Sequence, residues 1–316
     1  MTKKIQRPCH LYQMFIRHDG VIFPCCRKWG IEEFAIGNIS DTDIINKISK
    51  FDIKCACYGY EFKKSENNIR QGSINIEFPM KCNGRCAMCC VSAPYKQNTI
   101  STYDYTRLLD FVSKINPRSL VVQGGEVLVQ PLTIEWLANI KKQFADLKIC
   151  IVTNGCVNSR MTGLCDILFE KMIISIVGFQ DLTYKAIMGL QLESTKKFAA
   201  KIINSTNIVT TLKYLCTPLN IHEIKPFMEW AVSINPYEIQ IVDADTINYI
   251  NLNTKIPFWH QLIERSSHDF LNSLIEHKDQ INSNQILISI DNSILNLFKI
   301  NLLDIQKAGL NPQIWF

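Results

Sequence analysis

From Ser73 to about residue 244, runs typical of β-strands alternate with runs typical of α-helices. The strand-like runs are Ile74–Pro79, Leu120–Gln123, Lys148–Thr153, Met172–Val177, Ile208–Leu215 and Glu238–Val242. The helix-like runs are Tyr103–Ile115, Thr133–Phe144, Arg160–Glu170, Thr195–Ile203 and His222–Ile234. Strands that alternate with helices pair in parallel, because each helix returns the chain to the starting edge of the sheet. About six such units are too few to close an eight-stranded barrel. The pattern therefore predicts an α/β fold with an open, partial (βα)6 barrel of the TIM type.

Glycine or polar residues directly follow several of these strand-like runs, for example at Gly124, Asn154 and Gly178. In parallel α/β folds the functional groups gather where the strands end. We therefore expect the functional site at the C-terminal edge of the predicted sheet.

The sequence divides into three predicted regions, 1–72, 73–245 and 246–316. The first region is a small module of its own. It is expected to hold a hairpin of Leu11–Arg17 and Val21–Pro24 around Asp19-Gly20, a helix over Asp41–Lys50 capped by Ser40 or Asp41, and a polar linker over Cys55–Arg70. The second region is the barrel core. The third is a C-terminal extension of helices with one extra strand.

The composition is that of an ordinary folded protein, with 47% hydrophobic and 20% charged residues. Disorder, collagen and coiled coil are thereby excluded as the main architecture. The net charge of +5 is too small to favour a nucleic-acid partner. The sequence has no apolar run near the ~18 residues of a membrane span, and Met1–Pro8 lacks the apolar segment of a secretory signal. A cytoplasmic protein without a membrane partner is expected.

Cysteine is the unusual residue, because the chain has 13 and their distribution is uneven. Those before residue 91 are Cys9, Cys25, Cys26, Cys55, Cys57, Cys82, Cys86, Cys89 and Cys90. Disulfides are poorly maintained in a reducing cytosol. The clustering therefore indicates that some of these thiols bind metal or take part in redox chemistry.

Cys82, Cys86 and Cys89 follow the first strand-like run with the spacing C-x3-C-x2-C. A [4Fe–4S] cluster usually takes four cysteines, so three ligands on one loop leave one iron open. Zinc also accepts thiolates, but a structural zinc site requires a closed set of four. Cys90 offers a fourth thiol, although adjacent cysteines rarely reach the same cluster.

Together with Gly124-Gly125-Glu126 after the second strand-like run, this loop resembles the radical S-adenosylmethionine (radical SAM) superfamily. The resemblance covers about residues 73–244. It implies that the three cysteines hold a [4Fe–4S] cluster and that the amino and carboxylate groups of SAM bind the open iron. It also implies that Gly124, Gly125 and Glu126 contact the SAM amino group. Glycine lets the backbone approach a ligand, and a carboxylate matches an ammonium group.

The resemblance extends to three further residues of the SAM site. Asn154 stands where the family often places a polar SAM contact, and Ser175 lies near the position of a ribose contact. The alternative for each of these two residues is an ordinary turn or sheet residue without a ligand contact. Met88 replaces the aromatic residue that the family usually has before the third cysteine, and its thioether can still pack on adenine.

The N-terminal cysteines resemble the auxiliary-cluster modules called SPASM and twitch. The expected ligands are Cys9, Cys25 or Cys26, Cys55 and Cys57. An Asp-Gly hairpin would bring Cys9 and Cys25 to the same end of a two-stranded ribbon. The module precedes the predicted barrel, and its later pair is C-x-C rather than the usual C-x2-C, which leaves the ligand set open. A structural zinc site is the alternative.

The resemblance implies an enzyme that cleaves SAM reductively to a 5′-deoxyadenosyl radical and abstracts hydrogen from a substrate. It implies an electron donor such as flavodoxin or ferredoxin. A peptide or protein is the favoured substrate, and a carbohydrate or other small metabolite is the alternative. A methyl-transferring relative and a non-catalytic Fe–S or zinc scaffold are further alternatives. No catalytic side chain, and no oxidoreductase, transferase or isomerase subclass, is assigned from the sequence.

Overall fold

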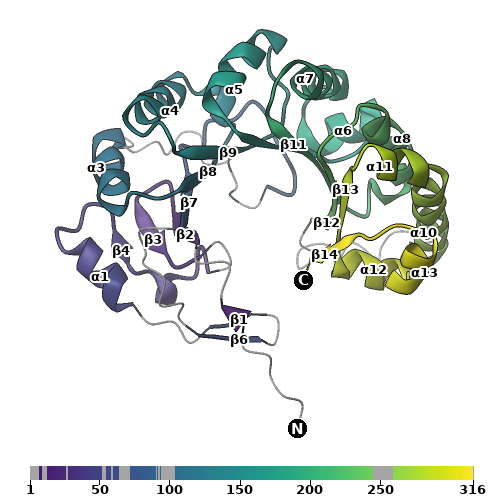
Figure 1. Ribbon diagram of the computed structural model, residues 1–316, viewed down its shortest axis with the longest axis horizontal. Coiled ribbons are helices and arrows are strands. Elements are labelled where there is room, and N and C mark those ends of the chain that lie inside the picture. Colours follow the sequence, from purple (N-terminus) through teal and green to yellow (C-terminus); the bar gives the residue numbers. More distant parts are fainter. Residues whose placement is uncertain are drawn as a thin grey trace. The chain divides into compact units, whose positions relative to one another are not determined.

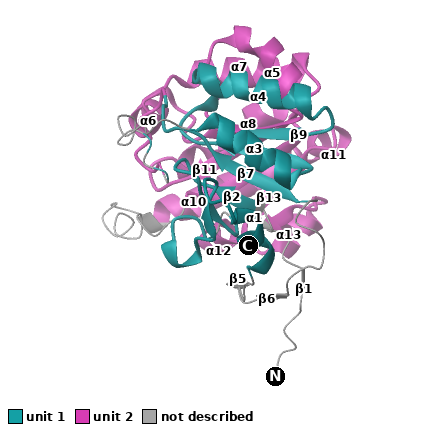
Figure 2. Ribbon diagram, turned by 90° about the vertical axis from the view of Figure 1, so that its left-hand side faces the viewer, with its two compact units in different colours: residues 1–82, 91–151 teal, residues 83–90, 152–316 magenta. Residues whose placement is uncertain are grey.

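The computed structural model describes residues 7–8, 13–25, 28–51, 55–57, 60–63, 72–89, 91, 93, 104–244 and 259–315. The chain folds as two compact units, which Figure 2 shows in different colours. Unit 1 contains residues 1–82 and 91–151, and unit 2 contains residues 83–90 and 152–316.

The main sheet of unit 1 joins strands from both the predicted N-terminal module and the predicted core. β7 (Ser73–Glu77) pairs in parallel with β8 (Ser119–Gln123), and β8 pairs in parallel with the start of β9 (Lys148–Thr153). On its other side β7 pairs in parallel with β2 (Gln13–Ile16). β2 continues through antiparallel pairings to β3 (Val21–Phe23) and β4 (Gly37–Asn38). The Asp19-Gly20 hairpin is thus confirmed, and it extends the same sheet that carries β7.

Helices α3 (Tyr105–Ile115) and α4 (Pro131–Gln143) lie on the same side of β7 and β8 (Figure 1). α3 begins where the Asp104 side chain accepts a hydrogen bond from Arg107 N–H at 2.9 Å, and it buries an apolar stripe of Leu108, Phe111, Val112 and Ile115. Along β8, Leu120 and Val122 are fully buried, whereas Val121 and Gln123 are partly exposed. One side of this strand therefore packs in the core and the other side is more open.

Two predictions for the N-terminal region are wrong. Helix α1 (Ile44–Lys50) starts later than expected, and its N-cap is Asp43 without a side-chain cap. Asp41 instead accepts hydrogen bonds from Asn38 N–H and Lys47 Nζ. The stretch expected to be a linker contains β5 (Cys55–Cys57) and β6 (Tyr60–Lys63), which form a three-stranded sheet with β1 (Arg7–Pro8). A short 3-10 helix, η1, covers Glu32–Phe34.

Unit 2 is built on a parallel sheet of β10 (Lys171–Ile176), β11 (Val209–Cys216), β12 (Glu238–Asp243), β13 (Leu287–Asp291) and β14 (Gln313–Trp315). The C-terminal region was expected to add one strand. Its described residues contain two, β13 and β14, and both continue the parallel sheet.

The helices of unit 2 include one that the sequence reading missed. They are α5 (Thr162–Leu168), α6 (Asp181–Met188), α7 (Leu192–Ser205), α8 (Ile224–Ser233), α10 (Trp259–Glu276), α11 (Lys278–Ser283), α12 (Asn292–Phe298) and α13 (Leu302–Lys307). The missed helix is α6, which ends at Gly189 in the left-handed conformation with φ +67°. The predicted α/β class with parallel strands is confirmed, with shifts at most element ends.

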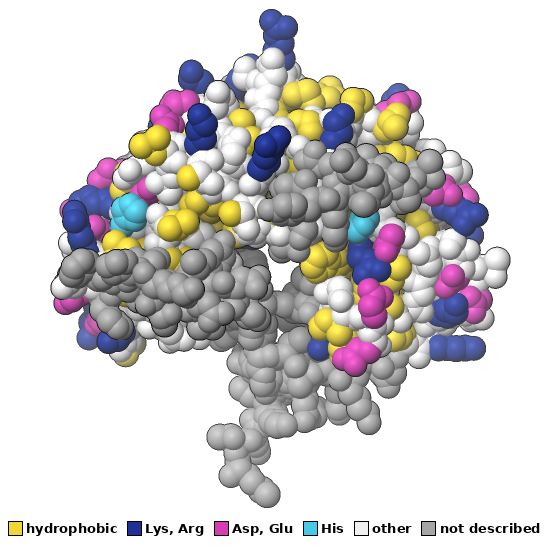
Figure 3. Space-filling model, turned by 180° about the vertical axis from the view of Figure 1, so that it is seen from behind, with side chains coloured by type: hydrophobic (Ala, Val, Ile, Leu, Met, Phe, Trp, Pro, Cys, Tyr) yellow, Lys and Arg dark blue, Asp and Glu magenta, His cyan; other side chains and the backbone are white. Residues whose placement is uncertain are grey.

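Within the described ranges, no helix has both the length and the apolar character that a membrane span requires. On the face drawn in Figure 3, basic and acidic side chains are interspersed among hydrophobic ones.

Candidate functional site

Gly124 and Gly125 form a turn at the end of β8 that lies directly against the segment leading to Cys82. A Cβ atom added to Gly124 would lie 2.6 Å from Phe78 O, and one added to Gly125 would lie 2.3 Å from Lys81 O. Real Cβ atoms essentially never approach another atom so closely. The structure thus shows a close approach of these glycines to the chain itself. Their contact with SAM stays a prediction.

Hydrogen bonds fasten the same segment, residues 78–81, to the glycine turn. Gly125 N–H donates to Pro79 O at 3.3 Å, and Glu126 N–H donates to Lys81 O at 2.9 Å. The Gln130 side-chain amide donates to Pro79 O at 2.8 Å and to Lys81 O at 3.0 Å. The backbone that leads to the first cysteine of the C-x3-C-x2-C motif is thus held rigidly at the C-terminal edge of β7 and β8.

Glu126 is buried, with 1% of its surface exposed. Its Oε1 accepts a hydrogen bond from Leu128 N–H at 3.1 Å, which caps the 3-10 helix η3 (Val127–Val129). The carboxylate therefore has a structural role in the turn.

In unit 2 the cysteine loop is fastened along its backbone. Arg85 N–H donates to Met188 O at 2.8 Å, and Ala87 N–H donates to Ile187 O at 2.9 Å. Both acceptors are the last residues of α6. Gly84 fits closely there, because an added Cβ atom would lie 3.3 Å from Met188 O. The missed helix α6 is thus the support for the part of the loop that carries Cys86 and Cys89.

Asn154, a predicted SAM contact, anchors this loop from the end of β9. Its Nδ2 donates to Asn83 Oδ1 at 2.9 Å, and its Oδ1 accepts from Cys156 N–H at 2.8 Å. Asn83 Nδ2 in turn donates to Cys156 O at 2.7 Å. Asn154 is therefore a positioning residue for the cysteine loop, and a SAM contact remains a prediction.

The other predicted site residues of unit 2 are partly exposed. Ser175 lies on β10 between the buried residues Ile174 and Ile176, so it faces the more open side of the strand. Met88 lies in the turn of the cysteine loop and is also partly exposed. Both positions are compatible with the predicted ligand contacts, which stay predictions.

Cys82, Cys86 and Cys89 are each partly exposed. Cys82 is the last residue of the first segment of unit 1, whereas Cys86 and Cys89 belong to unit 2. Within the described part of the chain, no three His, Cys, Asp or Glu side chains converge as a metal site. The fit to a cluster therefore rests on the chemistry of the three thiols and on the rigid backbone beside them.

The N-terminal cysteines are described only in part. Cys25 is buried and follows β3. Cys55 and Cys57 are the first and last residues of β5. Cys9 and Cys26 lie outside the described residues. The auxiliary ligand set stays a prediction.

Two buried acidic residues with functional or structural roles were not found from the sequence. Glu77 is fully buried at the end of β7, and its Oε1 pairs with His18 Nδ1 at 2.5 Å. Glu223 is also fully buried, and its Oε2 accepts backbone N–H groups of Phe179 and Gln180. A charged residue inside an apolar strand run, as in Ile-Asn-Ile-Glu before Phe78, is the signal that could have identified Glu77.

Two solved structures are similar to this chain over most of its length. SuiB from Streptococcus suis, bound to the precursor peptide SuiA, matches with a TM-score of 0.53 and 11% sequence identity over 86% of this chain and 67% of SuiB. Native anSMEcpe with bound AdoMet and Cp18Cys peptide matches with a TM-score of 0.50 and 16% identity over 69% of this chain. The match spans 63% of the length of anSMEcpe. No protein-family model and no curated protein matches the sequence.

SuiB and anSMEcpe are radical SAM enzymes with SPASM or twitch domains. At such low identity the likeness shows the fold alone. The chain therefore has a fold similar to that of these two enzymes.

Proposed function

We propose that the chain is a radical SAM enzyme that acts on a peptide. The observation that carries this proposal is the attachment of residues 78–81 to the turn of Gly124, Gly125 and Glu126. Within unit 1 it fastens the segment that leads to Cys82 to the Gly-Gly-Glu turn. The parallel strands that end there support the partial barrel, which is also part of the proposal.

In this proposal Cys82, Cys86 and Cys89 hold a [4Fe–4S] cluster. The bound cluster and SAM would supply reductive SAM cleavage to a 5′-deoxyadenosyl radical, which takes a hydrogen atom from the substrate. The chain's own residues position these groups. The Gly124-Gly125 turn holds the arm that leads to Cys82, and Asn154 holds the arm that leads to Cys86 through Asn83.

A peptide substrate is supported by the two neighbours, whose structures contain a precursor peptide or the Cp18Cys peptide. A carbohydrate or other small metabolite is the alternative class. The proposal includes an auxiliary Fe–S cluster in the N-terminal module and an electron donor such as flavodoxin or ferredoxin. Thirteen cysteines suit a reducing compartment such as the cytoplasm.

Anaerobic reconstitution tests the two cysteine sets separately. With two clusters, the protein should bind about eight irons and eight sulfides, because each [4Fe–4S] cluster holds about four of each. A variant with Cys82, Cys86 and Cys89 replaced by alanine should keep about half of the iron. Cys165→Ala is the control, because Cys165 is buried in α5 and has no place in either set.

About four irons in the wild-type protein, all lost in the triple variant, would remove the auxiliary cluster from the proposal. Zinc in place of iron in the triple variant would identify the N-terminal site as a structural zinc site.

A further inference from the structure

His18 and Glu77 form an acid–base pair in unit 1, where the neighbouring parallel strands β2 and β7 end. Glu77 Oε1 lies 2.5 Å from His18 Nδ1 and 3.4 Å from His18 N. The Glu77 side chain is fully buried, whereas the His18 side chain is 24% exposed. The imidazole ring thus connects a buried carboxylate with the surface.

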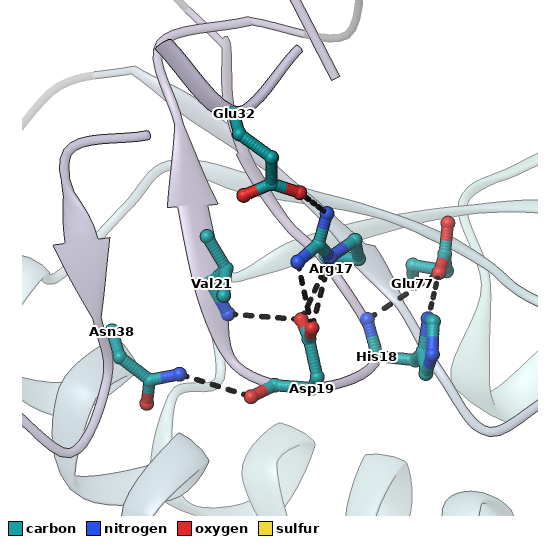
Figure 4. A network of polar contacts seen from close by, with 7 residues as sticks. All are labelled: Arg17, His18, Asp19, Val21, Glu32, Asn38 and Glu77. Atoms are coloured by element: carbon teal, nitrogen blue, oxygen red, sulfur yellow. Dashed lines mark hydrogen bonds and ion pairs between the residues drawn. The ribbon is translucent and has the colours of Figure 1, made fainter. Parts of the chain in front are cut away.

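Each member of the pair has a polar atom without a partner. Glu77 Oε2 is buried and has no hydrogen-bond partner among the described residues. In the same part of the chain, no hydrogen bond reaches His18 Nε2. Figure 4 shows the second carboxylate oxygen of Glu77 pointing away from His18. A buried oxygen left unpaired carries a desolvation cost, which a bound donor removes.

Glu238 of unit 2 is a buried carboxylate with a different set of contacts. Its Oε1 accepts from Ser289 Oγ at 2.6 Å and from Gln240 Nε2 at 3.0 Å. Its Oε2 accepts from Thr211 Oγ1 at 2.8 Å. Both oxygens of Glu238 are thus satisfied by neighbouring side chains, whereas Glu77 Oε2 and Glu223 Oε1 have no hydrogen-bond partner among the described residues.

The position of the pair connects it with the proposed SAM turn. Glu77 is the last residue of β7, and its register partner on β8 is Gln123. Gln123 directly precedes Gly124. Glu77 and Gln123 occupy the side of their strands opposite to the buried Ile76 and Val122, which is the more open side of β8.

The turn that carries His18 is held in place on both sides of the histidine. Arg17 donates to Asp19 through Nε at 2.9 Å and Nη2 at 2.7 Å, and its Nη1 pairs with Glu32 at 2.5 Å (Figure 4). Asn38 Nδ2 donates to Asp19 O at 3.0 Å. Burial raises the pKa of Asp19, but Arg17 and Val21 N–H lower it more, so this pKa lies below its usual value. Arg17 thus pairs with Asp19 and Glu32, and Asp19 also interacts electrostatically with His18. The side-chain hydrogen bond of His18 goes to Glu77.

This geometry has a defined chemical consequence. A carboxylate accepts hydrogen bonds only, so it holds the proton of the imidazole on Nδ1 and leaves Nε2 as an acceptor. When Nε2 takes a proton, the carboxylate stabilises the imidazolium that forms, as in other base and orienting-acid pairs.

We propose that His18 is the proton-accepting group of the substrate site, with Glu77 as its positioning residue. His18 Nε2 takes the proton of an N–H or O–H group of the bound peptide. The peptide keeps the electron pair of that bond, and the imidazolium returns the proton to water afterwards. The location of the substrate rests on the proposed function, whereas the reactivity of the histidine does not.

Modification by diethyl pyrocarbonate, mapped by mass spectrometry on the full-length protein, tests this reactivity. An accessible imidazole nitrogen that bears no proton attacks a carbonyl carbon of this reagent and becomes carbethoxylated. His18 should react at Nε2, and nitrogen-15 spectra of the protein should show it protonated at Nδ1. Glu77→Gln replaces a charged acceptor by an amide that can pair with either tautomer. It should slow the reaction of His18 about fivefold.

The matched control is His268, an exposed histidine on α10, whose reaction rate should be the same in both proteins. His18→Asn is the second variant, because the asparagine amide can still donate to Glu77 but offers no Nε2. Its melting temperature should stay within about 2 °C of that of the wild type. Its peptides should carry no label at position 18.

Protection of His18 from diethyl pyrocarbonate by added peptide tests whether the histidine lies in the substrate site. The probe is a pool of N-acetylated peptides that lack His, Lys and Cys, added at millimolar concentration. It should slow the modification of His18 at least about threefold and leave His268 unchanged. No protection, an unreactive His18, or a reaction that Glu77→Gln does not slow would overturn the proposal. These outcomes do not depend on SAM cleavage, so they are distinct from a failure of the proposed function.

Discussion

Gly125→Ala should cost the protein most of its cluster-binding capacity. The added methyl group would lie 2.3 Å from Lys81 O and 2.6 Å from Met80 O, and both neighbours are backbone atoms that cannot rotate away. The segment before Cys82 must therefore shift. We expect a loss of at least about 2 kcal/mol in the free energy of unfolding. We also expect less than about half of the wild-type iron after reconstitution, because the loop no longer presents its thiols correctly.

Gly163→Ala is the matched control for this substitution. Gly163 lies in α5, and an added Cβ atom would meet nothing within 4 Å. Alanine has the higher helix propensity, so this variant should gain about 0.5–1 kcal/mol and bind iron normally. Wild-type stability and iron content in Gly125→Ala would show that the contact between the two motifs is unimportant.

Glu126→Gln should weaken SAM binding about 10- to 100-fold, the second large effect that we expect. Glutamine retains an oxygen that can accept from Leu128 N–H, so the cap of η3 can persist. What is lost is the negative charge that matches the SAM ammonium group, and a charge-assisted hydrogen bond contributes about 1.5–3 kcal/mol. The measurement is SAM affinity by calorimetry on reconstituted protein, together with its iron content, which should stay near that of the wild type.

Glu223→Gln is the matched control, because it replaces a buried carboxylate that has no expected role in SAM binding. Glu223 is a fully buried carboxylate that also accepts backbone N–H groups, from Phe179 and Gln180, and the sequence gives it no place in the SAM site. Both glutamine variants should lose some stability, but only Glu126→Gln should lose SAM affinity. Equal SAM affinity in the two variants would leave Glu126 as a structural cap alone.

The fold could be predicted from the sequence where local pattern and tertiary environment agree. β9 was predicted at its observed bounds, because Lys148–Thr153 is a β-branched run that ends at a turn. β6 was missed, because Tyr60–Lys63 mixes aromatic and charged residues in a polar stretch, and its pairing with β1 and β5 is not visible locally. α6 was missed because a short helix of 8 residues has little periodicity, although Gly189 marks its end.

The site shows the same division between local and tertiary information. The spacing of the cysteines and the Gly-Gly-Glu sequence identify the motifs, but the contact of Gly125 with Lys81 O depends on the register of β7 and β8. The pairing of His18 with Glu77 joins residues far apart in the sequence through the β2–β7 pairing. Such roles follow from packing, which residue spacing alone does not encode.

Reductive SAM cleavage tests the central proposal most directly. The full-length protein, reconstituted anaerobically with iron and sulfide and then reduced, is incubated with SAM, and 5′-deoxyadenosine and methionine are measured. We expect both products to form slowly even without a substrate, and we expect none from the Cys82, Cys86 and Cys89 alanine variant. A cluster-loaded, reduced protein that binds SAM but forms no 5′-deoxyadenosine, or forms S-adenosylhomocysteine instead, would contradict the proposed function.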